Sequence, residues 1–270
     1  MNDKTNMVGG LFDIGVNLNS GQYNNRVDEI LARAHEHGVS ELIAIASDVA
    51  ESKALDEYPD FENVQVWTTA GVHPHQAKTF DATTIEKLKS CYENKRCIAI
   101  GECGLDYNRM YSPKDDQRRA FIDQIELANS LKAPLYLHQR DAHDDFMEIL
   151  KRREGLAGVV HCFTDGPEVL RDYLDMGLYV GITGWVCDER RGQSLRDALQ
   201  LIPLDRLLLE TDAPYLKPRN YKGPMKLKSN EPCLLPHIAA YVADQLKLSV
   251  EKLTKQTREN TYRLFGLGDP

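Results

Sequence analysis

The sequence contains no C-x-x-C pair, although six cysteines occur, at positions 91, 97, 103, 162, 187 and 233. This absence argues against a zinc ribbon and against a redox dithiol. Several of these cysteines lie in apolar segments, where a reduced cysteine behaves as a small hydrophobic residue. A reducing compartment fits this usage best, and we expect the protein to be cytoplasmic.

Long apolar runs are also missing, so the sequence offers no candidate for a membrane-spanning helix. The first ten residues, "MNDKTNMVGG", are polar and lack the apolar core of a secretory signal peptide. We expect residues 1–10 to form a flexible leader. Because no linker, repeat or low-complexity tract interrupts the rest of the chain, we expect residues 11–270 to form a single domain.

The sequence also lacks an excess of basic residues. It has 33 Lys and Arg and 41 Asp and Glu, which give a net charge of −8. Such a chain has no global attraction to nucleic acid or to an anionic membrane. A phosphate-bearing substrate is not excluded, because a bound metal ion inverts the field locally.

Short apolar runs alternate with longer amphipathic segments along the chain. The expected strands are 11–18, 41–47, 64–72, 97–102, 134–140, 158–163, 178–183 and 206–212. Helices are expected at 115–132, at 144–153 and, as one or two closing helices, within 232–265. In the first of these helices Phe121, Ile125 and Ala128 share one helical face.

Strands that alternate with helices predict parallel pairing through crossover connections. The length of 270 residues suits an α/β barrel of the TIM type, (β/α)8, which typically needs ~250 residues. An open doubly wound sheet is the alternative. The first expected strand is not followed by G-x-G-x-x-G, which weakens the nucleotide-binding version of that alternative.

Four charged or imidazole side chains fall at the ends of four different expected strands: Glu102, His138, His161 and Asp212. In a barrel of this type the C-terminal ends of the strands form the active-site rim. Neutral imidazole and carboxylate are the ligands of hydrolytic divalent metals. Each residue alone has a simpler reading as a hydrogen-bonded core group. Their convergence on one rim favours a metal site that all four residues build.

The stretch "AIGECGLDYN" places Glu102 at the end of an apolar strand, between Gly101 and Gly104. A buried carboxylate without a partner costs several kcal/mol. A metal ion would neutralise Glu102, and the two glycines would let the backbone bend around the site.

Three further residues are candidates for binding substrate. His73 in "AGVHPH" suits contact with a phosphate, or alternatively a loop histidine that binds backbone carbonyls. Arg140 lies two residues after His138, hence on the same strand face, and suits bidentate phosphate binding, or alternatively an internal salt bridge to Asp106. Tyr107 is a candidate for stacking on a base or sugar, or else a plain rim aromatic.

These segments together resemble the TatD family of metal-dependent deoxyribonucleases, within the amidohydrolase-like barrel superfamily. The resemblance runs from about Phe12 to Gly266. In chain order the segments are "FDIGVNL", "AGVHPH", "AIGECGLDYN", "HQRDAH", "HCFTDG", "GITGWVCDERRG", "LLLETDAPYL" and "NEP".

One departure separates this chain from most of the family. The usual pattern D-x-H-x-H at the end of the first strand is replaced by "DIGVN", which puts Gly15 and Asn17 at the histidine positions. The branch for which the family is named resembles this chain in lacking the pair. In the wider family that pair helps to hold one of two metal ions, and the bridging glutamate with the histidines of strands five and six holds the other. The resemblance therefore implies that the second site remains, on Glu102, His138 and His161.

The resemblance implies a 3′–5′ exonuclease that hydrolyses phosphodiester bonds of single-stranded DNA and perhaps of RNA, in DNA repair or degradation. It implies Mg²⁺ or another divalent ion such as Mn²⁺ or Zn²⁺. We expect a monomer in which Glu102 and Asp212 are catalytic, with Asp212 acting as general base on water or as a further metal ligand. The alternatives are an amide or ester hydrolase of the same superfamily, such as an aminoacyl-tRNA deacylase, and a non-catalytic metal or nucleic-acid binding protein.

Overall fold

A computed structural model describes residues 10–23, 26–153 and 155–269. The expected flexible leader therefore lies, apart from Gly10, outside the described residues. None of the helices in the described part of the chain is both long and apolar enough to cross a membrane.

Parallel strands form one sheet in which each strand pairs with its neighbours in chain order. They are β1 (Leu11–Val16), β2 (Val39–Ala44), β3 (Gln65–Ala70), β4 (Cys97–Asp106), β5 (Leu135–Arg140), β6 (Gly158–Val160), β7 (Tyr179–Ile182) and β8 (Leu207–Leu209). The two ends of the sheet meet beyond β8, where Val16 forms a parallel bridge with Ala213 and the Asn17 amide donates to the Ala213 carbonyl at 2.7 Å. The sheet is thus a nearly closed barrel, which confirms the predicted fold class.

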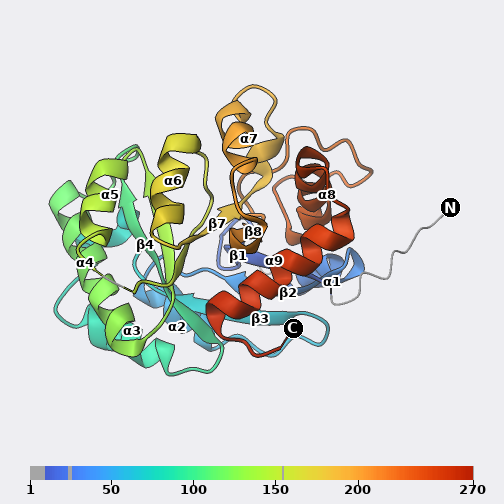
Figure 1. The fold of residues 1–270 in the computed structure, drawn as a ribbon. Coiled ribbons are helices and arrows are strands. Elements are labelled where there is room, and N and C mark those ends of the chain that lie inside the picture. Colours follow the sequence, from blue (N-terminus) through green and yellow to red (C-terminus); the bar gives the residue numbers. More distant parts are fainter. Residues whose placement is uncertain (1–9, 24–25, 154, 270) are drawn as a thin grey trace.

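Helices surround this barrel, as Figure 1 shows. They are α1 (Val27–Glu36), α2 (Val49–Asp56), α3 (Thr84–Tyr92), α4 (Lys114–Leu131), α5 (His143–Leu150), α6 (Pro167–Asp175), α7 (Gln193–Leu199), α8 (Leu235–Leu246) and α9 (Val250–Phe265). The predicted helix at 115–132 is α4, which buries Phe121, Ile125 and Ala128 as the spacing predicts. The closing region is two helices, α8 and α9.

Both faces of the sheet are buried, which explains why the strands read as continuous apolar runs. In β5, Tyr136 points into the barrel interior and packs in a cluster with Ile14 and Leu208. Its neighbours Leu135 and Leu137 belong to the larger cluster beneath the surrounding helices. This alternation leaves only the strand ends free to carry polar chemistry.

The N-terminal end of the barrel is closed by a polar cluster around Glu41 of β2, which is 5% exposed. Arg258 of α9 forms an ion pair with the Glu41 carboxylate. Tyr262 Oη donates to the same carboxylate at 2.8 Å, and Trp67 Nε1 of β3 donates to it at 3.1 Å. Helix α9 is thereby fixed to the barrel end opposite the strand C-termini.

We predict that Glu41→Ala lowers the free energy of unfolding by about 3–5 kcal/mol, because Arg258, whose side chain is only 14% exposed, loses its anionic partner. Urea denaturation followed by circular dichroism measures the loss. Glu62→Ala, which removes an exposed glutamate, serves as the control and should leave the midpoint unchanged. Equal midpoints for the two variants would show that the ion pair contributes nothing to stability.

Candidate active site

A cavity of about 650 Å³ opens at the C-terminal ends of the strands. Its lining includes the four predicted metal ligands, Glu102, His138, His161 and Asp212, and also His73 and Arg140. Tyr107 is not among the lining residues: its hydroxyl donates to Asp145 at 2.6 Å, and Lys114 Nζ lies 4.0 Å from its ring centroid. The structure thus brings six of the seven predicted site residues together at one cavity, and Tyr107 is outside its lining.

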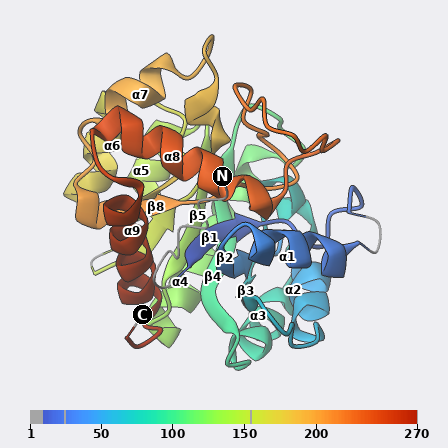
Figure 2. The ribbon, with the colours of Figure 1, turned by 90° about the vertical axis from the view of Figure 1, so that its right-hand side faces the viewer.

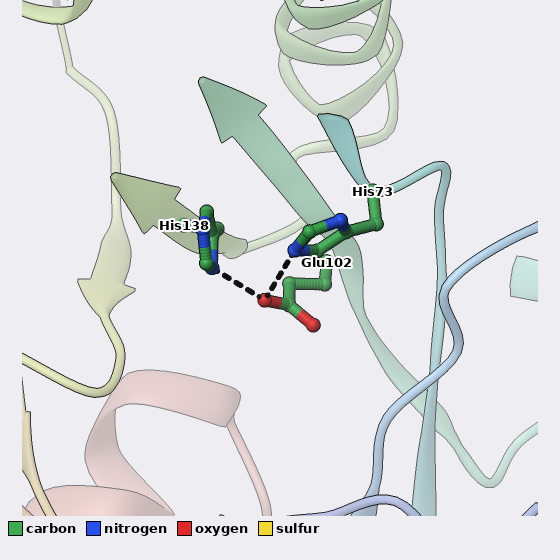
Figure 3. A group of neighbouring side chains, drawn as sticks. All are labelled: His73, Glu102 and His138. Carbon is green, nitrogen blue, oxygen red and sulfur yellow. Dashed lines mark ion pairs between the residues drawn. The ribbon is translucent and has the colours of Figure 1, made fainter. Parts of the chain in front are cut away.

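Glu102 lies at the centre of this cavity, 6% exposed, on β4. Its Oε1 is 2.7 Å from His161 Nε2, 2.8 Å from His138 Nδ1 and 3.3 Å from His73 Nε2. Figure 3 shows His73 and His138 converging on this one oxygen. Burial alone would raise the pKa of Glu102, but the imidazoles of His73 and His161 outweigh it and hold the pKa well below its usual range.

The backbone on both sides of Glu102 runs very close to β5. Gly101 and Gly104 have φ angles of 142° and 149°, a region that other residues rarely adopt. A Cβ at Gly101 would lie 2.2 Å from the Tyr136 carbonyl oxygen, and one at Gly104 would lie 1.8 Å from that of His138. The two glycines are thus required for β4 to bring Glu102 against His138.

Two of the three imidazoles have a carboxylate behind them. His161 Nδ1 lies 3.4 Å from Glu210, and His138 Nε2 lies 3.5 Å from Asp106. His161 Nε2 and His138 Nδ1 face Glu102, and they would be the nitrogens that coordinate a cation bound beside this carboxylate. This carboxylate–histidine arrangement is typical of metal-binding histidines.

The electrostatics of these two histidines agree with a cation site. Burial would lower the pKa of His161, but the charges of Glu102 and Glu210 raise it well above its usual value. Burial would also lower the pKa of His138, and hydrogen bonds to Asp106 and Glu102 raise it instead. The cluster therefore favours positive charge at its centre, which a divalent ion supplies. A donor set of one carboxylate and two imidazoles fits such an ion.

His73 belongs to the same group by distance, because its ligand atom and those of Glu102 and His138 all lie within 4.8 Å of one another. Its tautomer distinguishes it from the other histidines. His73 Nδ1 accepts a hydrogen bond from the His75 amide at 3.0 Å, so the ring proton resides on Nε2 and points at Glu102. Burial lowers the pKa of His73 to about 4, so the ring is neutral near pH 7. His73 is thus a hydrogen-bond donor to Glu102.

Two carboxylates behind the histidines, Asp106 and Glu210, are absent from the site residues predicted from the sequence. Asp106 accepts from His75 Nε2 at 2.8 Å and from the backbone amides of Asn108 and Arg109. In the described part of the chain its ion-pair partners are His75 and His138, not Arg140. The sequence did carry a signal for Asp106. Asp106 lies four residues after Glu102, and side chains an even number of residues apart in a strand lie on the same face.

Glu210 explains the missing H-x-H pair. It is fully buried, and its carboxylate accepts from Tyr136 Oη at 2.9 Å. A Cβ at Gly15 would lie 2.4 Å from Glu210 Oε2 and 2.6 Å from Tyr136 Oη. The space that the first histidine of the pair would need is therefore filled. The sequence alone did not reveal this, since Gly15, Tyr136 and Glu210 lie on three separate strands or strand ends.

Asp212 is positioned from β1. Asn17, at the second histidine position, donates its amide Nδ2 to Asp212 Oδ1 at 3.0 Å. Asp13 accepts from the Thr211 amide at 2.9 Å and from Thr211 Oγ1 at 2.6 Å, which anchors the preceding residue. Asp212 itself has a φ of 54° and a pKa that burial raises to about 7. Asn17 thus acts as a donor that orients Asp212.

Two guanidinium groups line the cavity without an acidic partner. Arg140 and Arg109 are both exposed, and within the described part of the chain neither side chain forms an ion pair or a side-chain hydrogen bond. Arginine in this state is available for bidentate binding of an anion.

This geometry agrees with comparisons to known proteins. The family model described as TatD related DNase matches residues 12–266. The chain belongs to this family. It is similar to the 3′–5′ ssDNA/RNA exonuclease TatD of Pantoea ananatis, with 46% identity over 259 residues that cover 95% of this chain and 100% of that protein. The protein of the same name from Musicola paradisiaca is 43% identical over 260 residues, covering 96% and 98% of the two chains. The resemblance inferred from the sequence is confirmed.

Solved structures of the family have the same architecture. A TatD family hydrolase from Entamoeba histolytica superposes with a TM-score of 0.85 at 25% identity, covering 95% of this chain and 98% of that one. The TatD homologue YJJV from Escherichia coli gives 0.82 at 26% identity with the same coverage. A phosphotriesterase homology protein from Escherichia coli, at 17% identity and a TM-score of 0.66, shares the fold.

We predict that Glu210→Gln weakens the binding of a divalent ion by about 10–100-fold, because it removes the charge behind His161. Calorimetric titration with Mn²⁺ measures the affinity. The matched control is Glu51→Gln, which changes another cavity-lining carboxylate that binds Ser47 at 2.7 Å. If both variants bind Mn²⁺ with equal affinity, the Glu210 charge does not contribute to metal binding.

Proposed function

We propose that this chain hydrolyses phosphodiester bonds at the 3′ end of single-stranded DNA, and of RNA, with a divalent metal ion as cofactor. The observation that carries this proposal is the convergence of His138 and His161 on Glu102 in a cavity that also exposes two unpaired arginines. The names of the relatives, which describe 3′–5′ ssDNA/RNA exonucleases, support the substrate and the polarity.

Glu102, His138 and His161 would hold the metal ion, for which we propose Mg²⁺, with Mn²⁺ or Zn²⁺ as alternatives. When bound, a divalent ion stabilises charge on a phosphoryl oxygen and lowers the pKa of a water molecule. We infer one resident ion rather than two, because Glu210 and Tyr136 fill the space at Gly15 that a second ligand set needs.

Asp212 is the proposed general base. Its Oδ1 accepts from Asn17, which leaves Oδ2 free to take a proton from the attacking water. Burial raises its pKa to about 7, close to the pH at which a general base is most effective. Glu102 contributes to catalysis by holding the histidines and the ion in place.

Arg140 and Arg109 are the proposed phosphate-binding residues, whereas His73, the other candidate, has its ring nitrogens engaged by the His75 amide and by Glu102 and is proposed to orient Glu102. The two guanidinium groups suit the non-bridging oxygens of a phosphodiester through paired hydrogen bonds. Contacts of this kind bind the phosphate backbone of the nucleic acid and do not distinguish between base sequences. Two unpaired cations favour an anionic phosphodiester over an uncharged amide or ester, the alternative that the sequence left open.

The cellular setting is proposed from the state of the cysteines. All six cysteines are free thiols in the structure, and a reduced state of this kind suits the cytoplasm. There the enzyme would act as a monomer on single-stranded ends in DNA degradation or repair.

We expect Asp212→Asn to lower kcat by about 10²–10⁴-fold, because the amide cannot accept the proton of the water. The wild-type rate should rise with pH through about 7, where the base loses its proton, and this rise should vanish in the variant. A gel-based exonuclease assay across pH, with metal content measured on the same sample, makes the test. Loss of the metal would identify Asp212 as a ligand, and near-normal turnover would assign the base elsewhere.

Arg140→Ala should raise KM for single-stranded DNA about tenfold or more while metal content stays the same, since hydrogen bonds to charged groups contribute ~1.5–3 kcal/mol. Steady-state kinetics with a fluorescent oligonucleotide gives KM and kcat separately. Arg171→Ala, which removes an exposed arginine of α6 outside the cavity, is the control. Unaltered kinetics in Arg140→Ala would remove this residue from the substrate site.

A further inference from the structure

A second cavity, of about 690 Å³, lies beside the connection between β8 and α8. Figure 2 shows this connection, in orange, projecting away from the barrel above α1. The residues that line the cavity are Gln22, Arg26, Arg33, Met225, Lys226, Leu227, Lys228, Ser229 and Glu231.

The charge of this cavity is positive, against the net charge of the chain. Arg33 binds Glu231 through two hydrogen bonds, Nε to Oε2 at 2.8 Å and Nη2 to Oε1 at 3.2 Å, so the two charges cancel. Arg26, Lys226 and Lys228 remain, all exposed. Among the ion pairs of the described residues none involves these three side chains, so their charge is available to an anion.

The second cavity adjoins the active-site cavity along two chain segments. On one segment Ser20 lines the active site and Gln22 lines the second cavity, and the Gln22 amide donates to Ser20 Oγ at 3.4 Å. On the other segment Asn230 Nδ2 donates to the carbonyl of Tyr215, which lines the active site, at 2.7 Å. Ser229, the neighbour of Asn230, lines the second cavity. Neighbouring residues of the same two segments therefore line the two cavities.

The walls of the second cavity are fixed by polar contacts to the barrel. Buried Tyr23 donates its hydroxyl to the Asn230 carbonyl at 3.1 Å, which ties the β1–α1 connection to the β8–α8 connection. Lys217 Nζ donates to the Leu227 carbonyl across the loop. Tyr215, which lines the active-site cavity and whose carbonyl binds Asn230, is 50% exposed, so its aromatic ring is accessible to a ligand.

We propose that the second cavity binds the phosphodiester backbone of the nucleic-acid strand that leads into the active site, and that Tyr215 stacks on a base between the two cavities. A basic groove with an aromatic platform is how proteins bind single strands without reading sequence. The inference rests on the proposed function, since it extends the substrate from the scissile end to the preceding nucleotides. It also explains how an acidic protein attracts a polyanion, through one local basic surface.

The test separates strand binding from hydrolysis. Fluorescence anisotropy in EDTA measures binding of a labelled single-stranded DNA of ~12 nucleotides, within the usual footprint of such proteins. The double variant Lys226→Ala/Lys228→Ala should bind this DNA at least about tenfold more weakly. The salt dependence of its log affinity should become shallower by about 1.4, since each phosphate contact on a single strand contributes ~0.7. Hydrolysis of a dinucleotide with Mg²⁺ should stay at the wild-type rate.

The matched control is Lys252→Ala/Lys255→Ala, which removes the same charge from exposed positions of α9. An equal loss of affinity in both double variants would mean that only net charge matters, and would overturn the proposal. Unchanged affinity and salt dependence in Lys226→Ala/Lys228→Ala would also overturn it.

Tyr215→Ala tests the stacking step, because it should weaken binding of the oligonucleotide but not of an abasic oligonucleotide of equal length. Equal losses on both ligands would contradict stacking. If the wild-type protein binds the oligonucleotide in EDTA but hydrolyses neither it nor the dinucleotide with any divalent ion, the proposed function fails while the second cavity keeps its binding role.

Discussion

The site depends on one buried carboxylate. Glu102 places a negative charge inside the barrel mouth, and three imidazoles surround a single one of its oxygens. Such a charge is tolerable only where partners surround it from several strands, and here the imidazoles come from β5 and from the segments that follow β3 and β6. The closed circular order of the sheet is what brings these strand ends together, so the fold and the cation site support each other.

The histidines that look alike in the sequence have different roles because of what lies behind them. His138 and His161 have a carboxylate at the far ring nitrogen, whereas His73 has a backbone amide there. The first two are thereby suited to coordinate a cation, and the third is suited to donate a proton to Glu102. Distance to Glu102 alone would have grouped all three as equivalent ligands.

Much of this architecture was predictable from the sequence. Hydrophobic periodicity predicted the barrel strands, and polar residues at strand ends predicted the rim, since the direction of parallel strands settles which ends meet. Asp106 could have been found from its even spacing from Glu102 along one strand, whereas the role of Glu210 arises from contacts across strands that no local pattern encodes. The orientation of Tyr107 was not predictable either, because its place in a motif does not reveal that its hydroxyl is held toward Asp145.

The filled space at Gly15 limits which substitutions this part of the chain can accept. A histidine at position 15 would collide with Glu210 and Tyr136, and the Glu210 carboxylate also holds the Cys162 amide. Introducing the first histidine of the wider family's pair would thus require coordinated replacement on β1, on β5 and after β8. Gly15, Tyr136 and Glu210 therefore form a coupled set, in which the residue at each position limits the size of the side chains that the other two allow.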